Sequence, residues 1–392
     1  MVSESGSARD NSIVSCEAKL QHFRDFTLAH PHLLAAKEQL MTTLVDSAQN
    51  SLVFVLGPTG VGKTTLRAKA EKDLTVGLAE HLQNDYARLP VVSVEAVAPE
   101  SGNFSWREHF KRLLDAMREP AIDYKLSRKG KPWGLGRPVF PFDPSARGAG
   151  AEYQHAVELA LRYRRPAAVF VDEAQHLSKT SSGRRLLDQL DVIKSLANRT
   201  GIPHVLLGTY DLLAFRNLNG QLSRRSTDVH FGRYRAERAN EAAIFANVVR
   251  SLEAQLPVGG SIDLARNWDY LYERSIGCVG ILKEWLVRAL SRALRRGQKG
   301  LERVDLESCA LSVSQCDKLL TECIEGEMRM TENSGSRRRL RARLGLKSPA
   351  ERSVPPQAVQ QAGSFRRRKH RRPGQRLPRR DAVGNVGCVH TS

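Results

Sequence analysis

The sequence predicts an α/β protein in which a parallel sheet is flanked by helices, followed by a smaller helical domain and a basic tail. Three observations carry this prediction. Short apolar runs alternate with helical stretches over the first 236 residues, which is typical of a parallel sheet covered on both faces. After Arg238 the strand signal stops and helical patterns remain. The excess positive charge is concentrated near the C-terminus.

Composition limits the classes to which the chain can belong. The 392 residues carry 61 Lys and Arg against 42 Asp and Glu, a net charge of +19, and 41% are hydrophobic. This hydrophobic content can form a real core, which excludes wholesale disorder, collagen-like chains and disulfide scaffolds. Six cysteines, no apolar run of membrane-spanning length and a polar N-terminus lead us to expect a cytoplasmic protein.

We expect four consecutive parts. They are an N-terminal extension (1–29), an α/β nucleotide-binding domain (30–236), a helical lid domain (237–331) and a disordered basic tail (332–392). No internal repeat is visible.

The expected strands are short and mostly apolar. The first is a continuous apolar run, which is typical of a strand buried on both faces. The five strands are expected at 51–56, 90–94, 167–171, 203–207 and 229–231.

The expected helices fill the intervals and the region after the last strand. Two lie within 14–50 and are separated by a break at His30-Pro31-His32. The others are expected at 63–87, 106–117, 151–165, 183–200, 238–255, 263–275, 279–296 and 303–331. Residues 119–150 are rich in Pro, Gly and basic residues, so they are expected to form a long loop or insert.

A glycine-rich turn follows the first strand and opens a helix. It matches the pattern G-x-x-x-x-G-K-[ST], in which glycines turn backbone N–H groups toward phosphate oxygens at a helix N-terminus. Lys63 is expected to reach the β- and γ-phosphates of ATP, and the Thr64 hydroxyl to bind Mg²⁺. The alternative is a purely structural glycine turn. The expected nucleotide-binding residues here are Gly57, Pro58, Thr59, Gly60, Val61, Gly62, Lys63, Thr64 and Thr65.

The third expected strand ends in two carboxylates, within VFVDEAQH. A buried strand places its C-terminal residues at the edge of the sheet where nucleotides bind. Asp172 is expected to hold Mg²⁺ through water, and Glu173 to orient and polarise the attacking water. The alternative is a solvated acidic start of a helix.

Four later residues are candidates for contact with a nucleotide. Thr209 follows the fourth strand and is expected beside the γ-phosphate, unless it only caps a helix. Arg224 and Arg225 precede the fifth strand; one of them is expected to stabilise phosphoryl charge in a neighbouring subunit, unless they form a plain surface pair. Lys283, near the start of a helix in the second domain, is a further candidate.

Three cysteines, Cys309, Cys316 and Cys323, are spaced seven residues apart. On one helical face they are expected to be small buried hydrophobic residues and not a metal site.

Two basic regions are candidates for binding polyanions. Residues 337–380 hold 16 Lys or Arg and one acid, which leaves residues 1–336 with a net charge of +5. Such a tail is expected to bind nucleic acid, unless it is only solubilising. The insert has Tyr124 and Trp133 among its basic residues and is expected to contact duplex DNA, unless it is a solvated loop. Its candidate DNA-binding residues are Lys125, Arg128, Lys129 and Lys131.

The order of these motifs resembles the AAA+ ATPase plan. GPTGVGKTT is similar to its Walker A motif, VFVDEAQHL to its Walker B motif, and LLGT, the paired arginines and GCVGILK stand at its sensor-1, arginine-finger and sensor-2 places. DEAQH together with LLGT resembles the TniB/TnsC regulators of transposition over about residues 30–295. This resemblance implies an ATP- and Mg²⁺-dependent regulator that forms a ring or filament on double-stranded DNA and links a target-selection protein to a transposase.

Other functions remain open from the residues alone. They are a nucleotide-binding adaptor with little hydrolysis, a signalling NTPase that uses the helical domain as a switch, and a replication-loader ATPase.

Overall fold

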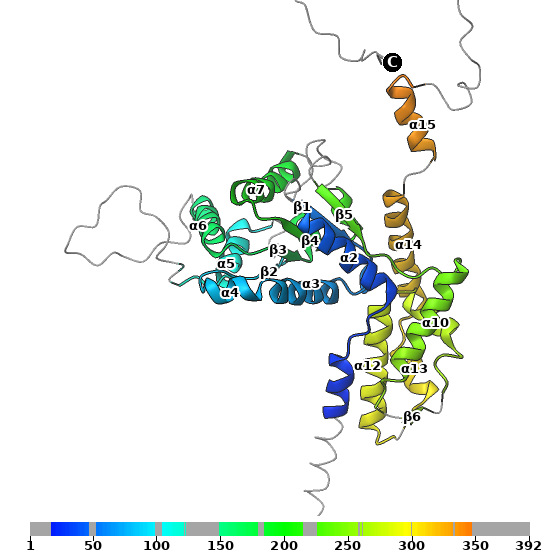
Figure 1. Cartoon of the computed structure of the whole chain (residues 1–392). Helices are drawn as coiled ribbons and strands as arrows, with labels where there is room; N and C mark the ends of the chain where they lie inside the picture. Colours follow the sequence, from blue (N-terminus) through cyan, green and yellow to red (C-terminus); the bar gives the residue numbers. More distant parts are fainter. Residues whose placement is uncertain are drawn as a thin grey trace, which may run out of the picture. The chain divides into compact units, whose positions relative to one another are not determined.

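The computed structural model describes most of the chain outside its termini. The described residues are 17–46, 52–98, 104–120, 122, 149–178, 184–214, 226–257, 259–260, 262–298, 300–331 and 334–346, with no side-chain description for 184–190. The chain divides into two compact units, residues 1–331 and 332–392. The sheet and the helical domain both belong to the first unit (Figure 1).

A five-stranded sheet with strand order β2-β3-β4-β1-β5 organises the first domain. All its neighbouring strands are parallel, and Leu52 of β1 is level with His204 of β4 and Ser226 of β5. The strands are β1 (Leu52–Leu56), β2 (Val92–Glu95), β3 (Val169–Asp172), β4 (His204–Gly208) and β5 (Ser226–His230). The predicted α/β class with a parallel sheet is therefore confirmed.

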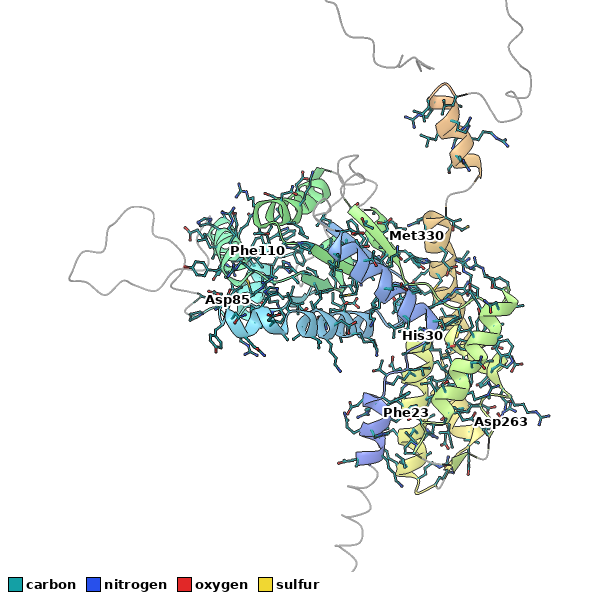
Figure 2. All side chains as sticks on the ribbon, viewed as in Figure 1. Phe23, His30, Asp85, Phe110, Asp263 and Met330 are labelled. Carbon is teal, nitrogen blue, oxygen red and sulfur yellow. The ribbon has the colours of Figure 1, made fainter. Side chains whose placement is uncertain are left out.

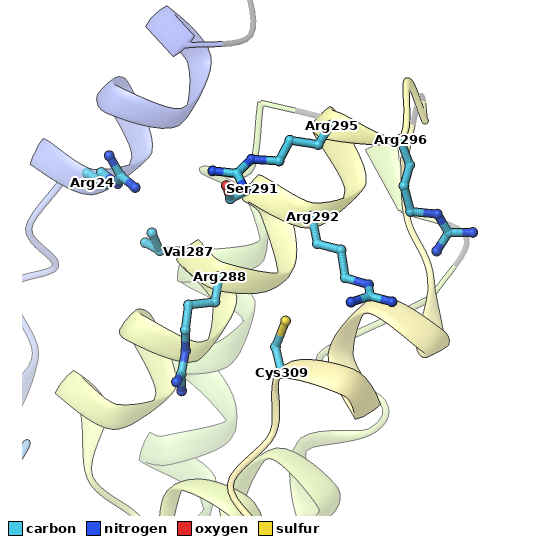
Figure 3. Close-up of a pocket in the computed structure, with 8 residues that line it drawn as sticks. All are labelled: Arg24, Val287, Arg288, Ser291, Arg292, Arg295, Arg296 and Cys309. Atoms are coloured by element: carbon cyan, nitrogen blue, oxygen red, sulfur yellow. The ribbon is translucent and has the colours of Figure 1, made fainter.

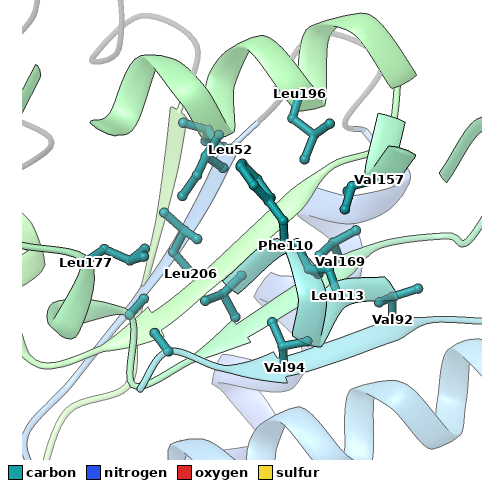
Figure 4. Close-up of a cluster of buried hydrophobic side chains, with 14 of the residues drawn as sticks. Leu52, Val92, Val94, Phe110, Leu113, Val157, Val169, Leu177, Leu196 and Leu206 are labelled. Carbon is teal, nitrogen blue, oxygen red and sulfur yellow. The ribbon is translucent and has the colours of Figure 1, made fainter. Parts of the chain in front are cut away.

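Helices cover both faces of this sheet because alternate residues of β1 point to opposite sides. Leu52, Phe54 and Leu56 pack in one cluster with residues of α5, α6 and α7 (Figure 4). Val53 and Val55 pack in a second cluster with residues of α2 and α3. The helices are α2 (Pro31–Val45), α3 (Lys63–Gly77), α4 (Ala79–Asn84), α5 (Trp106–Ala116), α6 (Ala149–Arg164) and α7 (Arg184–Thr200). The run expected as one helix over 63–87 is two helices, α3 and α4.

The helical domain is built around α12, whose Trp285 and Leu286 are fully buried in a core of their own. Its helices are α10 (Ala239–Glu253), α11 (Trp268–Ser275), α12 (Val279–Arg295), α13 (Arg303–Cys309) and α14 (Val313–Met330). Two predictions are corrected here. The helix expected over 303–331 breaks after Cys309, and two short parallel strands, β6 (Gly259–Gly260) and β7 (Gly300–Leu301), lie where no strand was expected. Strands of two residues are too short to show a period of two in the sequence.

The N-terminal helix (residues 17–25) contributes to the helical domain. Phe23 is completely buried in the core of that domain, and Leu20, Phe26 and Leu28 pack around the same core (Figure 2). The break predicted before the second helix is confirmed, since α2 begins at Pro31. The chain therefore passes from the helical domain into the sheet domain before β1.

Three histidines in the first unit are buried. Burial is the main cause that lowers the pKa of each of them to about 4, which keeps the rings neutral at pH 7. His204, at the start of β4, is 2% exposed, and its Nδ1 lies 3.0 Å from the carbonyl oxygen of Ile202. The three are His30, His109 and His204.

The described part of the second unit contains one helix, α15 (Ser334–Arg343). This corrects the expectation of disorder for these residues. The physical reason is that Arg, Leu and Ala have high intrinsic helix propensities and that no proline interrupts the stretch. Of the helices that the structure describes, none is both long and apolar enough to span a bilayer.

Candidate functional site

The glycine-rich loop between β1 and α3 has a backbone that requires glycine. Gly60 and Gly62 have φ angles of +73° and +112°. These conformations are open to glycine and strained for other residues. Gly57 is needed for a different reason, because a Cβ atom there would lie 2.2 Å from the carbonyl oxygen of Phe231. The loop is thus held in one shape at the N-terminus of α3.

Lys63, the first residue of α3, points back into this loop. It is 7% exposed, and its Nζ donates hydrogen bonds to the carbonyl oxygens of Gly57 (3.1 Å) and Pro58 (2.9 Å). Burial lowers the pKa of Lys63, and the nearby carboxylates of Glu173 and Asp172 oppose that change. An anion bound in the loop would therefore be attracted by the charge of the Lys63 ammonium group and would accept hydrogen bonds from it.

Thr64 meets the end of β3. Its hydroxyl donates a hydrogen bond to Oδ2 of Asp172 at 3.0 Å, although the two residues are 108 positions apart in the sequence. Asp172 is 4% exposed, and its Oδ1 accepts a hydrogen bond from the backbone N–H of Glu173 at 3.0 Å. A hydroxyl and a carboxylate are hard oxygen donors of the kind that Mg²⁺ prefers, so the two side chains fit that ion.

Arg67, one turn further along α3, also approaches this carboxylate. Its Nε lies 3.5 Å from Oδ2 of Asp172 and 3.5 Å from Oε1 of Glu71. Arg67 is not among the predicted site residues, although it lies one turn after Thr64 on the same face of the helix.

Glu173 is linked to the tip of β4 through Gln175. The side-chain amide of Gln175 donates a hydrogen bond to Oε2 of Glu173, and its Oε1 accepts one from the backbone N–H of Thr209 at 3.2 Å. Glu173 itself has a positive φ of +51°, which is uncommon for a residue with a side chain. Gln175 was part of the motif read in the sequence but was assigned no role there.

The Thr209 side chain does not form the helix cap that was the alternative to a place beside the γ-phosphate. Its hydroxyl donates to Oδ2 of Asp211 at 3.2 Å, and it makes no side-chain cap on the short 3₁₀ helix Tyr210–Leu212. The next residue, Tyr210, is hydrogen bonded through its hydroxyl to Nε2 of His230 at 2.8 Å.

The helical domain touches the site at two places. At the first, the backbone N–H of Ile281 in α12 donates to the carbonyl oxygen of Gly60 at 3.0 Å. A Cβ atom at Gly280 would lie 2.4 Å from that same oxygen, so the start of α12 packs directly on the glycine-rich loop.

At the second place, α14 packs beside the tip of β4. A Cβ atom at Gly326 would lie 2.1 Å from Cδ2 of Tyr210, the neighbour of Thr209. The adjacent Glu327 forms ion pairs with Arg233 (3.1 Å) and Arg235 (3.3 Å), which follow β5. No pattern in the sequence indicates these contacts, because their members lie between 92 and 116 residues apart in the chain.

Lys283 has partners other than those expected from its place in the sequence. Its Nζ donates to the carbonyl oxygens of Arg24, at 2.7 Å, and Phe26. Lys283 therefore fastens α12 to the chain that follows the N-terminal helix. The expected contact of this side chain with a nucleotide stays a prediction.

The cysteines at the heptad spacing divide between two helices. Cys309 ends α13, while Cys316 and Cys323 lie on α14 and are buried near Cys278. In the described ranges of the chain, no group of three or more His, Cys, Asp or Glu side chains is arranged to hold a metal ion.

Six of the predicted site residues fall outside the described residues. They are Arg224 and Arg225 before β5, and the candidate DNA contacts Lys125, Arg128, Lys129 and Lys131.

The strand order, the glycine-rich loop and the paired Thr64 and Asp172 define a P-loop ATPase fold of the AAA+ type. The sequence model of a family described as "AAA domain" matches residues 46–215, which agrees with this assignment. That match includes β1 to β4 and the loop.

Several solved structures are similar to this chain at low sequence identity. The ADP form of the Aeropyrum pernix ORC2 protein is 15% identical over 75% of this chain and 72% of its own, with a TM-score of 0.48. Cdc6p from Pyrobaculum aerophilum is 16% identical over 74% and 69%, with a TM-score of 0.46. Drosophila ORC bound to DNA is 12% identical over 86% and 81%, with a TM-score of 0.42. None of the curated proteins is detectably similar in sequence.

Proposed function

We propose that this protein binds ATP with Mg²⁺ between β1 and α3. The observation that carries this proposal is the 3.0 Å hydrogen bond from Thr64 to Asp172. It lies beside a loop in which Gly60 and Gly62 have positive φ angles that favour glycine. Mg²⁺ in such sites is held by one or two protein oxygens and by the substrate phosphates. Lys63 would exchange its two backbone carbonyl partners for phosphate oxygens, which also carry charge.

Hydrolysis of the bound ATP is assigned to the carboxylate that follows the metal ligand. Glu173 would orient and polarise the attacking water, and its hydrogen bond to Gln175 restrains the position of the carboxylate. Thr209 is connected to the same Gln175 side chain and would lie beside the γ-phosphate. Mg²⁺, when bound, would neutralise charge on the phosphates during transfer.

The biological role that we propose is ATP-dependent regulation of transposition. The protein would assemble as a homo-oligomer on target DNA and recruit or activate a transposase. The motifs DEAQH and LLGT support this proposal, together with the net charge of +19. One of Arg224 and Arg225 would act on the nucleotide of the neighbouring subunit, and the basic insert would contact the duplex.

The chemical part of the proposal is tested by ATP turnover with and without duplex DNA. Lys63→Ala should lose nucleotide binding, whereas Glu173→Gln should bind ATP normally and hydrolyse it at least about 100-fold more slowly. The matched control is Glu80→Gln, which makes the same change at an exposed position on α4. Normal turnover in Glu173→Gln would show that another group activates the water.

The arginine assignment is tested by mixing subunits. Arg225→Ala and Glu173→Gln are each expected to be slow alone, and their mixture should recover some turnover at interfaces that combine an intact arginine with an intact glutamate. The same mixture made with Arg224→Ala tells the two arginines apart. If neither replacement lowers turnover, neither arginine acts in trans.

The role in transposition is tested with the partner proteins. Capture on duplex DNA with ATP should retain a transposase encoded beside this protein's gene, and Lys63→Ala should abolish that retention. Retention of a replicative helicase in place of a transposase would favour the replication-loader alternative.

A further inference from the structure

The outer face of α12 carries a row of arginines that the nucleotide site does not use. Four of them are spaced so that they share one face of the helix. With Arg24 of the N-terminal helix they surround a pocket of about 540 Å³ (Figure 3). We name this feature the arginine pocket and define it by Arg24, Arg288, Arg292, Arg295 and Arg296.

Two members of the arginine pocket are held by a buried carboxylate. Asp305 is fully buried, and its Oδ1 lies 3.1 Å from Arg296 Nη1 and 3.7 Å from Arg292 Nε. The same side chain forms part of the capping box that begins α13. Its position is therefore set by the fold, which restrains these two partly exposed guanidinium groups beside the pocket.

The other three members have no such partner. Within the residues that the structure describes, no ion pair joins Arg24, Arg288 or Arg295 to a carboxylate, and all three are exposed. The five arginines of the pocket thus carry five positive charges, and the Asp305 carboxylate is the negative charge paired with two of them. An incoming anion would gain attraction from several guanidinium groups without first displacing a carboxylate.

Favourable interaction of arginines with the dipole of α12 does not account for all five arginines of the pocket. Basic residues are common in the last turn of a helix because the C-terminal end carries negative partial charge. Arg292 and Arg295 lie in that last turn. Arg288 lies two turns before the end of α12, and Arg24 comes from another helix, so the dipole of α12 does not explain their presence at the pocket.

The dimensions and the lining of the pocket select the kind of anion. From Arg288 to Arg296 the row extends about 12 Å along the helix, at 1.5 Å per residue, which is too long for one phosphate group. Successive phosphates of one DNA strand rise about 3.4 Å along the duplex axis and also wind around it, so a row of this length can reach more than one of them. No aromatic ring lines the pocket, and stacking on unpaired bases is therefore not provided for.

We propose that the arginine pocket binds the phosphate backbone of duplex DNA without reading the base sequence. Guanidinium groups suit this task because they stay charged and donate paired hydrogen bonds to phosphate oxygens. The inference rests on the DNA binding in the proposed function and adds a contact surface on the helical domain, separate from the basic insert and the tail.

The test compares three full-length variants by fluorescence anisotropy with a random-sequence duplex at several salt concentrations. In the pocket variant, Arg24, Arg288 and Arg295 are each changed to Gln. If each contacts one phosphate, the slope of log K against log[salt] should become shallower by about 2–3, at 0.9 per phosphate. The tail is present in every variant, so its contribution cancels in the comparison.

The control variant removes the same charge elsewhere, with Arg112→Gln, Arg250→Gln and Arg329→Gln at exposed positions on three other helices. Its slope should change by less than about 1, because net charge alone acts weakly through salt screening. A third variant with Lys at the three pocket positions should recover most of the slope. Inorganic phosphate should compete with the duplex no better than its ionic strength predicts.

The outcomes distinguish a failure of the arginine pocket as a DNA contact from a failure of DNA binding by the whole protein. Equal slopes in the wild-type protein and the pocket variant, or equal changes in the pocket and control variants, would overturn the assignment of the pocket while DNA binding stands. A wild-type protein that fails to bind duplex at low salt would overturn the proposed function as well. ATP affinity and the melting temperature of each variant confirm that it is folded.

Discussion

Removing Glu327 should destabilise the first unit more than any exposed carboxylate can. Glu327 is 7% exposed and Arg233 is 6% exposed, and the carboxylate also pairs with Arg235. In Glu327→Ala the Arg233 guanidinium stays buried with one neutral partner, the Tyr272 hydroxyl at 3.1 Å. Breaking a buried pair by deleting one member typically costs about 3–5 kcal/mol.

This loss of unfolding free energy corresponds to a measurable decrease in the melting temperature. For the 331 residues of the unit, an unfolding entropy of about 2.1 cal/mol/K per residue gives about 0.7 kcal/mol/K in total. A loss of 3–5 kcal/mol then lowers the melting temperature by about 4–7 °C if the unit unfolds cooperatively. Differential scanning calorimetry measures both the shift and the cooperativity.

The neighbouring Glu325 provides the matched control. Its side chain is 58% exposed and reaches Arg329 at 4.0 Å, so Glu325→Ala should cost less than about 0.5 kcal/mol. The double change Glu327→Leu with Arg233→Met should recover much of the loss, because apolar residues of similar volume often replace a buried ion pair without penalty. Equal melting temperatures for Glu327→Ala and Glu325→Ala would refute this reasoning.

Three further predictions follow from the site and the core. Gln175→Ala frees the Glu173 carboxylate that we propose to be catalytic, and should lower kcat about 10-fold or more with little change in ATP affinity, a difference that steady-state kinetics and nucleotide titration resolve together. Gly280→Ala should push α12 off the glycine-rich loop and weaken ATP binding, whereas Gly77→Ala, where a Cβ meets nothing within 4 Å, should not. His204 has a pKa of about 4 in the fold and about 6.5 unfolded, so the unfolded state binds more protons between those values and stability falls as the pH drops. His204→Leu should therefore remove about 2 kcal/mol of the stability lost between pH 7 and pH 5 in urea titrations, and an unchanged pH dependence would contradict the burial argument.

Much of the sheet domain could be predicted from the sequence because its signals are local. The apolar run of β1, the glycines that follow it and Lys63 are adjacent in the chain, and each restricts the backbone or the burial of the next. The two carboxylates at the end of β3 could be placed at the same edge for a similar reason, since parallel strands present their C-terminal ends together. The fold class follows from this logic, whereas the strand order β2-β3-β4-β1-β5 was not predicted and comes from the structure.

The remaining features depend on contacts between distant segments, which no local pattern records. Cys309 and Cys316 have helical spacing, yet the chain breaks between them because separate capping boxes begin α13 and α14. Lys283 stands at the place of a nucleotide contact, yet the N-terminal segment offers it backbone carbonyls within hydrogen-bond distance. Both features depend on partners that are remote in the chain or on caps that the apolar pattern does not record.

The sequence by itself determined that this chain has a glycine-rich phosphate loop, an acidic strand end and a parallel sheet to hold them, because those properties lie in short continuous segments. Only the tertiary structure decided how the helical domain meets them. The bond from Ile281 to Gly60, the packing of Gly326 on Tyr210 and the arginine row facing Arg24 all join segments remote in the chain. Sequence patterns record which face of an element is buried, but they do not record which distant segment it meets.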